Sequence, residues 1–238
     1  TENFPRRSFY ALDAAGNQTK LLRFEPNYDL RIRPWYISAT AVKKPIWTEI
    51  YTFFLGDLGI TAAQPFYDNQ GEFRGVIGVD IVLGQISNFL RSIEISRSGQ
   101  IFIMVRSGAL VGSSTDEKPY ITGTDGKAQR LQATDSKNIL TSAVSKHIMI
   151  NFNLSQVEPP KKLQFRFNNQ SNFVHILSYK DKIGLDWLVI VVIPENDFME
   201  QINGNTRTTI LLCFAALILP IIIGIFTARS IAQPILQL

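Results

Sequence analysis

One short stretch near the start of the sequence concentrates arginine and aromatic side chains. It reads PNYDLRIRPWYISA over residues 26–39, and it contains Tyr28, Arg33, Trp35 and Tyr36. A guanidinium group binds a carboxylate or phosphate through two parallel hydrogen bonds, and tryptophan adds one N–H donor and a large apolar face. A core does not need arginine, and a solvated surface does not need adjacent Trp and Tyr. The combination therefore predicts a pocket for a small, flat or anionic molecule.

A carboxylate in an unusual context lies further along the chain. Asp80 ends the run GVIGVD, in which only apolar residues and glycine precede it. On a buried strand such a carboxylate needs a cation, several hydrogen-bond donors or a proton. An arginine pocket together with a separate carboxylate would suit a zwitterion. Two structural interpretations stand beside this one: Arg33 and Asp80 pair with each other in a salt bridge, or Trp35 and Tyr36 are ordinary core residues.

A short helix and several strands must position these residues. RPWYISATAVKK is typical of a helix with Pro34 in its first turn. Residues three apart share a helix face, so we expect Arg33 beside Tyr36, with Trp35 offset to one side. EIYTFFL, which carries Tyr51, GITAAQPFY and EFRGVIGVDIVL are expected strands, separated by turns at residues 56–59 and 68–71.

The remaining pattern also alternates strands, turns and helices. We expect a hairpin in SFYALDAAGNQTKLLRF, a helix in LGQISNFLRSIEI and a second hairpin around Ser107-Gly108. A loop is expected over residues 114–138, then a helix in SKNILTSAVSKHI capped by Ser136. Three strands are expected over residues 162–193. This order predicts an α+β fold with two antiparallel-sheet modules in series.

An apolar run near the end of the sequence predicts a transmembrane helix. TTILLCFAALILPIIIGIFTA, residues 208–228, carries no charge between Arg207 and Arg229. This length crosses roughly 30 Å of hydrocarbon. A soluble core helix would show a polar face, and Pro220 is better tolerated in a spanning helix than in a soluble one. We expect the helix to begin near residue 195 and to run into the membrane.

Composition argues against several classes of function. The 238 residues include 24 basic and 20 acidic side chains, which gives a net charge of +4. The basic residues are scattered, so we expect no nucleic-acid partner. With only Cys213, His147 and His175 as cysteine and histidine residues, we expect neither a metal site nor a cofactor. No Gly-x-Ser-x-Gly elbow or convincing Ser-His-Asp set is present, so we do not expect an enzyme.

RPWY, a following tyrosine, GVIGVD and a second sheet module together resemble the double Cache sensor domain. That family has a PAS-like extracellular fold and occurs in bacterial chemoreceptors, sensor kinases and cyclases. The resemblance covers about residues 1–200, and the tail ARSIAQPILQL, which contains Pro234, looks like the start of a HAMP linker. It implies a receptor region for chemotaxis, two-component or cyclase signalling. We expect its sensor part outside the cell or in the periplasm, its anchor in the lipid of the cell (inner) membrane, and a homodimer.

The resemblance also implies a division of the chain. Residues 1–90 would form a membrane-distal, ligand-binding module, and residues 91–194 a membrane-proximal module. Residues 195–228 would form the helix that enters the membrane, and residues 229–238 the start of the HAMP-like linker. The sequence does not include the long N-terminal helix and the first membrane helix of the family, so we expect it to be a fragment of a receptor.

One subgroup of double Cache domains is implied to bind free α-amino acids. Its pattern is a tyrosine, an arginine five residues later, Trp-Tyr after one spacer, then a further tyrosine and an aspartate. The matching residues are Tyr28, Arg33, Trp35, Tyr36, Tyr51 and Asp80. The resemblance implies that Arg33 and Trp35, helped by Tyr28, hold the ligand carboxylate. It implies that Tyr36, Tyr51 and Asp80 hold the ammonium group.

Three other hypotheses remain open on the sequence. The chain could be a Cache-fold auxiliary or structural membrane subunit without a small-molecule ligand, which a failed ligand screen on folded protein would favour. It could sense an amine or another carboxylate, although the pattern contains partners for both charges of an amino acid. It could be an anchored extracellular hydrolase, which turnover of amino acids would favour.

Overall fold

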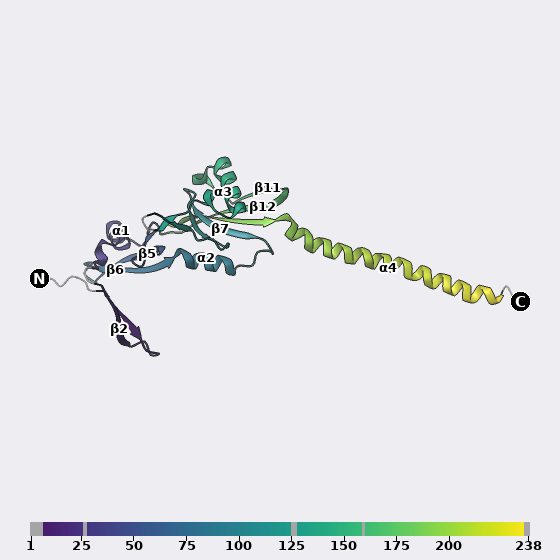
Figure 1. Ribbon diagram of the computed structural model, residues 1–238, viewed down its shortest axis with the longest axis horizontal. Coiled ribbons are helices and arrows are strands. Elements are labelled where there is room, and N and C mark those ends of the chain that lie inside the picture. Colours follow the sequence, from purple (N-terminus) through teal and green to yellow (C-terminus); the bar gives the residue numbers. More distant parts are fainter. Residues whose placement is uncertain (1–6, 26–27, 125–127, 159, 236–238) are drawn as a thin grey trace. The chain divides into compact units, whose positions relative to one another are not determined.

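A computed structural model describes residues 7–25, 28–124, 128–158 and 160–235 (Figure 1). The strands β1 (Arg7–Leu12) and β2 (Gln18–Glu25) form the expected antiparallel hairpin. Asp13 stabilises its turn, because its Oδ1 atom accepts hydrogen bonds from the backbone N–H groups of Ala15 at 2.9 Å and Asn17 at 2.8 Å. The side-chain amide of Asn17 also donates to Asp13 Oδ2 at 3.0 Å, and this bond, with the backbone bonds, holds the pKa of Asp13 below its ordinary value.

A helix and a small sheet follow the hairpin. A 3-10 turn (Leu30–Ile32) leads into α1 (Pro34–Val42), which begins with Pro34 as expected and ends where Lys43 takes a left-handed backbone conformation, φ 57°. The next elements are β3 (Ile46–Trp47), β4 (Tyr51–Thr52), β5 (Leu58–Tyr67), β6 (Phe73–Val82) and α2 (Leu83–Ser92). They match the expected strands and helix, although only two residues of EIYTFFL pair as a strand.

The four-stranded sheet places its long strands beside α1. Its order is β3-β5-β4, and β6 also pairs with β5. The β5–β6 pairing is antiparallel and sets Thr61 opposite Asp80 and Ala63 opposite Gly78. Figure 1 shows α1, β5 and β6 close together, and α1 packs on both strands. Opposite residues share a sheet face, so this register decides which side chains lie near Asp80.

A five-stranded sheet forms from the later strands, in the order β11-β12-β13-β7-β8. Its hairpin of β7 (Gln100–Val105) and β8 (Leu110–Ser113) and its strands β11 (Lys161–Phe167), β12 (Gln170–Lys180) and β13 (Asp186–Pro194) confirm the expected strands. Alternate residues of β13 are fully buried, namely Leu188, Ile190 and Val192. This alternation is the period-two pattern of a strand with one covered face.

Two expectations for the segment between the hairpin and β11 are wrong. The stretch expected to be loop contains β9 (Tyr120–Thr122), β10 (Ala128–Arg130) and a 3-10 turn (Ala133–Asp135). The helix α3 (Ile139–Asn151) is capped by Asn138 and not by Ser136, since Asn138 Oδ1 accepts from the Thr141 N–H at 2.9 Å. Ser136 lies too far before the helix to reach it, and its hydroxyl donates to Glu117.

The chain divides into two compact units. The first contains Thr1–Ile93, Ile101–Lys161 and Ile176–Ile190, and the second contains Glu94–Gln100, Lys162–His175 and Val191–Leu238. The modules expected at residues 1–90 and 91–194 stay a prediction.

The long helix α4 (Glu195–Ile235) belongs to the second unit, and Figure 1 shows it as one continuous helix. Within the part of the chain that the structure describes, it is the one helix long and apolar enough to cross a membrane. Its candidate span is Thr208–Phe226, with mean hydropathy 2.8 and no residue buried. The helix continues past Arg229 into the segment expected to open a linker, whose last residues, 236–238, lie outside the described part.

Asp197 in the first turn of α4 binds the segment before β7. Its Oδ2 atom accepts hydrogen bonds from the Ser96 hydroxyl and the Ser98 N–H, each at 2.7 Å, and Oδ1 accepts from the Ser98 hydroxyl at 2.7 Å. Burial raises the pKa of Asp197, but these hydrogen bonds outweigh that effect and hold the pKa below its ordinary value. The negative charge also suits the positive end of the helix dipole.

Candidate functional site

Tyr51, Thr61 and Asp80 form a hydrogen-bonded chain across three strands. The Thr61 hydroxyl donates to Asp80 Oδ1 at 2.6 Å, and it lies 2.7 Å from the Tyr51 hydroxyl. A threonine hydroxyl has one proton to donate, so the Tyr51 hydroxyl must be the donor to Thr61. The local fold sets this order, because the β4–β5 and β5–β6 pairings bring the three side chains together.

The environment of Tyr51 keeps its hydroxyl protonated. Burial raises the pKa of Tyr51 and the negative charge of Asp80 raises it further, while the hydrogen bond to Thr61 and the charge of Arg33 act in the opposite direction. The net effect is a pKa above the ordinary value. Tyr51 is therefore a neutral hydrogen-bond donor at physiological pH.

Arg33 also lies near the ring of Tyr51. Its Nη2 atom donates to the Thr52 carbonyl at 3.0 Å, and its guanidinium carbon is 5.9 Å from the centre of the Tyr51 ring. Among the residues that the structure describes, Arg33 makes no ion pair with Asp80. Asp80 is itself exposed, so its charge does not need a buried counter-ion. The interpretation in which Arg33 and Asp80 form a structural salt bridge therefore does not agree with the described residues.

Trp35 lies on the same face of the sheet as Thr61 and Asp80. A Cβ atom built on Gly78 would be 3.2 Å from Trp35 Cε3 and 3.1 Å from Thr61 Cγ2. Gly78 is two residues before Asp80 on β6, so both positions point to one face. The missing side chain at Gly78 is what lets the indole ring of Trp35 approach the strand.

The other two expected residues lie in neighbouring aromatic clusters. The Tyr36 ring meets Trp35 edge-on at 5.6 Å and Phe73 at 6.3 Å between ring centres. The Tyr28 ring meets the Phe54 ring edge-on, at 4.9 Å between ring centres. The structure thus connects Arg33 to Tyr51, and connects Tyr51 to Asp80 through Thr61. Trp35 and Tyr36 contact each other, and Tyr28 packs against Phe54.

Thr61 is a further residue of this site, beyond the six expected from the sequence. A lone threonine in an apolar strand is not conspicuous, yet this side chain is only 1% exposed and joins two of the expected ligand-binding residues. The available signal was the pairing of GITAAQPFY with EFRGVIGVDIVL, which sets a hydroxyl opposite Asp80 once the register is known.

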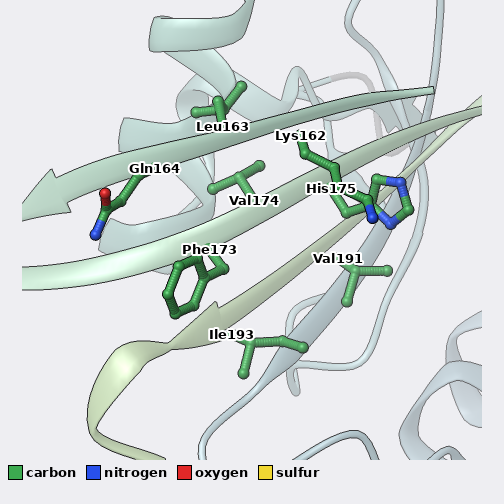
Figure 2. Close-up of a pocket in the computed structure, with 8 residues that line it drawn as sticks. All are labelled: Lys162, Leu163, Gln164, Phe173, Val174, His175, Val191 and Ile193. Carbon is green, nitrogen blue, oxygen red and sulfur yellow. The ribbon is translucent and has the colours of Figure 1, made fainter. Parts of the chain in front are cut away.

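The second unit carries a different hollow, of about 390 Å³, on strands β11, β12 and β13. Figure 2 shows Phe173 and His175 on β12 and Val191 and Ile193 on β13 along its wall. The wall is mainly apolar, and His175 Nε2 is buried there with no hydrogen-bond partner among the described residues. It offers no arginine and carboxylate pair, so its chemistry differs from that around Tyr51.

No group of three or more His, Cys, Asp or Glu side chains among the described residues is arranged to hold a metal ion.

Comparison with known proteins gives one family and several relatives. The family described as "Cache domain" matches residues 1–202. The chemotaxis protein McpC of Bacillus subtilis is 25% identical over 217 residues, which is 90% of this chain and 28% of McpC. Adenylate cyclase 1 of Rhizobium meliloti is 23% identical over 232 residues, 95% of this chain and 33% of the cyclase. The chain thus spans a third or less of these curated relatives.

The chain is also similar to solved structures of ligand-binding domains. The ligand-binding domain of the amino acid chemoreceptor PctB of Pseudomonas aeruginosa, in complex with L-Arg, is 19% identical with a TM-score of 0.45. That match covers 79% of this chain and 65% of the PctB chain.

Proposed function

Because the chain belongs to the Cache domain family, whose members are sensor domains of chemoreceptors and histidine kinases, we propose that it binds a free α-amino acid through the residues around Tyr51. The signal would pass along α4 to an output domain on the other side of the membrane. That output would be a chemotaxis, histidine kinase or cyclase domain.

The observation that carries this proposal is the separation of the two charges at the site. Arg33 lies near the ring of Tyr51, and Asp80 is connected to the Tyr51 hydroxyl through Thr61. Among the described residues, Arg33 and Asp80 are not paired with each other. A structural ion pair would consume both charges. Charges held apart by a neutral tyrosine can instead meet the carboxylate and the ammonium group of one zwitterion.

The carboxylate end of the ligand would lie at Arg33. One of its five N–H donors is bound to Thr52, and this bond orients the guanidinium plane. The remaining donors can bind a carboxylate through two parallel hydrogen bonds. Trp35, held over Gly78, would supply the indole N–H as the family pattern implies, with Tyr28 nearby.

The ammonium end would lie at Asp80. Its Oδ1 atom already accepts from Thr61, which fixes the carboxylate plane, and Oδ2 carries no bond to another described residue. An ammonium group has three donors, and Asp80 together with the oxygen atoms of Tyr51 and Tyr36 would accept them. Tyr51 can accept from the ligand while it donates to Thr61.

The helix α4 would carry the response through the membrane. We place the sensor region outside the cell or in the periplasm and the span Thr208–Phe226 in the cell (inner) membrane. A ligand shifts the balance between two arrangements of the sensor only by binding one of them more tightly. In a homodimer, two copies of α4 could then change their relative position.

The first experiment is a thermal-shift screen of the twenty amino acids on the whole chain in detergent, followed by calorimetry on those that raise the melting temperature. We expect at least one α-amino acid to bind with one ligand per chain. The matching deaminated acid and the matching amine, which each lack one charge, should bind much more weakly.

The Asp80→Asn variant tests the ammonium end, because it keeps the size of the side chain and removes its charge. It should lose affinity for the amino acid and change little for the deaminated acid. If no amino acid binds to the folded chain, the proposal is wrong and an auxiliary subunit is favoured. If the amine or the deaminated acid binds as tightly as the amino acid, the ligand belongs to that class instead.

A further inference from the structure

A polar cavity in the first unit is separate from the site around Tyr51. It has a volume of about 270 Å³, and its wall includes Trp47, Thr48, Glu49, Arg106, Arg130 and Trp187. These residues come from β3 and the segment after it, the turn that follows β7, the end of β10 and the start of β13. The wall thus combines two arginines, which can bind an anionic group, with two tryptophans, which can contact apolar carbon atoms. This combination suits a small organic anion.

Arg106 is a fixed part of the wall. Its Nε atom donates to Asp186 Oδ1 at 2.8 Å, Nη1 to the Leu154 carbonyl at 2.5 Å and Nη2 to the Ser178 hydroxyl at 2.6 Å. Its three nitrogen atoms are therefore all bound within the protein. Arg106 and Asp186 neutralise each other and leave little capacity for a ligand.

Arg130 differs from Arg106 because most of its hydrogen-bonding capacity is not used by the described residues. Its Nη2 atom donates to the Ala109 carbonyl at 3.3 Å, but Nε is buried with no partner among the residues that the structure describes. Burial lowers the pKa of Arg130, and the charge of Glu49 only partly opposes this. A cation with N–H groups that lack an acceptor is unfavourable, so an acceptor in the cavity that reaches Nη1, which makes no bond to another described residue, would stabilise this arrangement.

We propose that this cavity is a second binding site, for a small monocarboxylate, with the guanidinium group of Arg130 as the partner of the ligand carboxylate. The Nη1 and Nη2 atoms of Arg130 form a planar fork that a carboxylate can accept, and Nη1 carries no bond to another described residue. The indole rings of Trp47 and Trp187 and the side chain of Ile60 would contact the short carbon chain.

The charges of the wall select one negative charge rather than two. Arg106 and Arg130 balance Glu49 and Asp186, so the lining is formally neutral before a ligand binds. A bound monoanion would give the cavity one net negative charge, located beside Arg130. A dianion such as phosphate would add a second negative charge, which the carboxylates of Glu49 and Asp186 would repel. Since a water molecule takes about 30 Å³ in the liquid, the cavity holds a carboxylate with a few carbon atoms.

The test is calorimetry on the whole chain in detergent, with acetate, propionate and pyruvate as separate probes and inorganic phosphate as the dianion. We expect saturable binding of at least one monocarboxylate, with one molecule per chain, and weaker binding of phosphate. The probes contain no ammonium group, and Arg33→Ala should leave their affinity unchanged. This variant separates the second site from the one around Tyr51, so either proposal can fail without the other.

Three variants assign the binding to Arg130. Arg130→Gln should weaken the monocarboxylate by roughly 30-fold or more, since it removes the charged partner. Arg130→Lys should recover part of the affinity, because it keeps the charge and loses the fork. Glu49→Gln should tighten binding, because it removes a negative charge near the ligand. The exposed Arg166→Gln is the matched control and should have no effect.

Melting curves accompany each variant, and if Arg130→Gln does not fold, Arg130→Lys and Glu49→Gln decide the question. The proposal is overturned if no monocarboxylate binds to the unaltered chain, if phosphate binds more tightly, or if affinity is the same with and without Arg130. It is also overturned if Glu49→Gln weakens binding.

Discussion

At the scale of single residues, the site around Tyr51 combines one fixed cation with one fixed anion. Arg33 is oriented by the Thr52 carbonyl, and Asp80 by the Thr61 hydroxyl. Each charged group thus uses one bond to the protein for its orientation and keeps others for a ligand. This arrangement makes the contribution of each residue separately measurable.

Replacement of Arg33 should remove most of the amino-acid affinity and leave the fold intact. Loss of a hydrogen-bonded charge partner of the ligand costs about 2–5 kcal/mol. Arg33→Lys should recover only part of this, because lysine lacks the planar fork. Calorimetry measures both variants, and Arg31→Ala is the control, since Arg31 is two residues away and binds Asp29 at 3.0 Å. Normal affinity in Arg33→Ala would show that the carboxylate binds elsewhere.

Tyr51 should make the stability of the fold depend on alkaline pH. Its pKa in the folded chain is raised above the ordinary value of 10.0, mainly by burial. A raised pKa means that the protonated form is favoured by folding, so this contribution is complete below about pH 10 and is lost as the pH rises through the raised pKa. The melting temperature of the unaltered chain should therefore fall more between pH 9 and about 11 than that of Tyr51→Phe. Equal slopes for the two proteins would mean that Tyr51 ionises as freely as in the unfolded chain.

At the scale of elements, the register of β5 against β6 positions the residues of the proposed ammonium end of the site. It sets Thr61 opposite Asp80 and keeps Gly78 under Trp35. A shift by one residue would turn both side chains to the other face, because side chains alternate along a strand. Thr61 is then the residue through which the strand pairing fixes the positions of Asp80 and Tyr51.

Thr61→Val should weaken amino-acid binding without a direct contact to the ligand. Valine keeps the shape of the buried side chain but can neither donate to Asp80 nor accept from Tyr51. The loss of two oriented partners, at about 0.5–1.5 kcal/mol each, predicts an affinity roughly tenfold lower. Thr61→Ser keeps the hydroxyl and is the matched control in the same calorimetric titration. A serine variant as weak as the valine variant would point to packing and not to the hydroxyl.

The sequence predicted the elements better than it predicted their exact contacts. Proline at the start of α1 and glycine-containing turns between strands are local signals, and the structure confirms them. Strands β9 and β10 have three residues each, too few for a period-two pattern. Asn138 and Ser136 are both good caps in isolation, and only the position of the first helical residue distinguishes them. Thr61 depends on a pairing between distant segments, which no local pattern contains.

At the scale of the whole molecule, Cache membership and an apolar helix make the chain a sensor joined to a candidate membrane span. The resemblance in the sequence predicted the family, and the family comparison confirms it over residues 1–202. The expected six-residue site, the two modules and the homodimer stay predictions. The site and the homodimer depend on a ligand and on a second chain that lie outside this sequence.

A flexible insertion in α4 should separate binding from signalling. The helix is continuous through residue 203, so a Gly-Ser segment inserted after Asn203 would interrupt it before the membrane span. Ligand affinity, measured by calorimetry, should stay near normal. Output of the full-length receptor should no longer respond to the amino acid. The control is an alanine-rich helical insertion of seven residues at the same place, which should keep the response. Ligand-controlled output with the flexible insertion would rule out mechanical coupling through α4.

The junction between β13 and α4 has a further consequence for the direction in which the helix faces. The strand ends at Pro194 and the helix begins at Glu195, so no intervening residue can absorb a twist. Each helical residue turns the chain by about 100°, so the azimuth of every later side chain is counted from the strand itself. One added residue would rotate the membrane span by about 100°, four by about 40°, and seven would return it to within about 20°. Signalling by such a sensor should therefore survive an insertion of seven residues better than an insertion of one. The angle through which the insertion rotates the membrane span, and not the number of added residues, should decide the outcome.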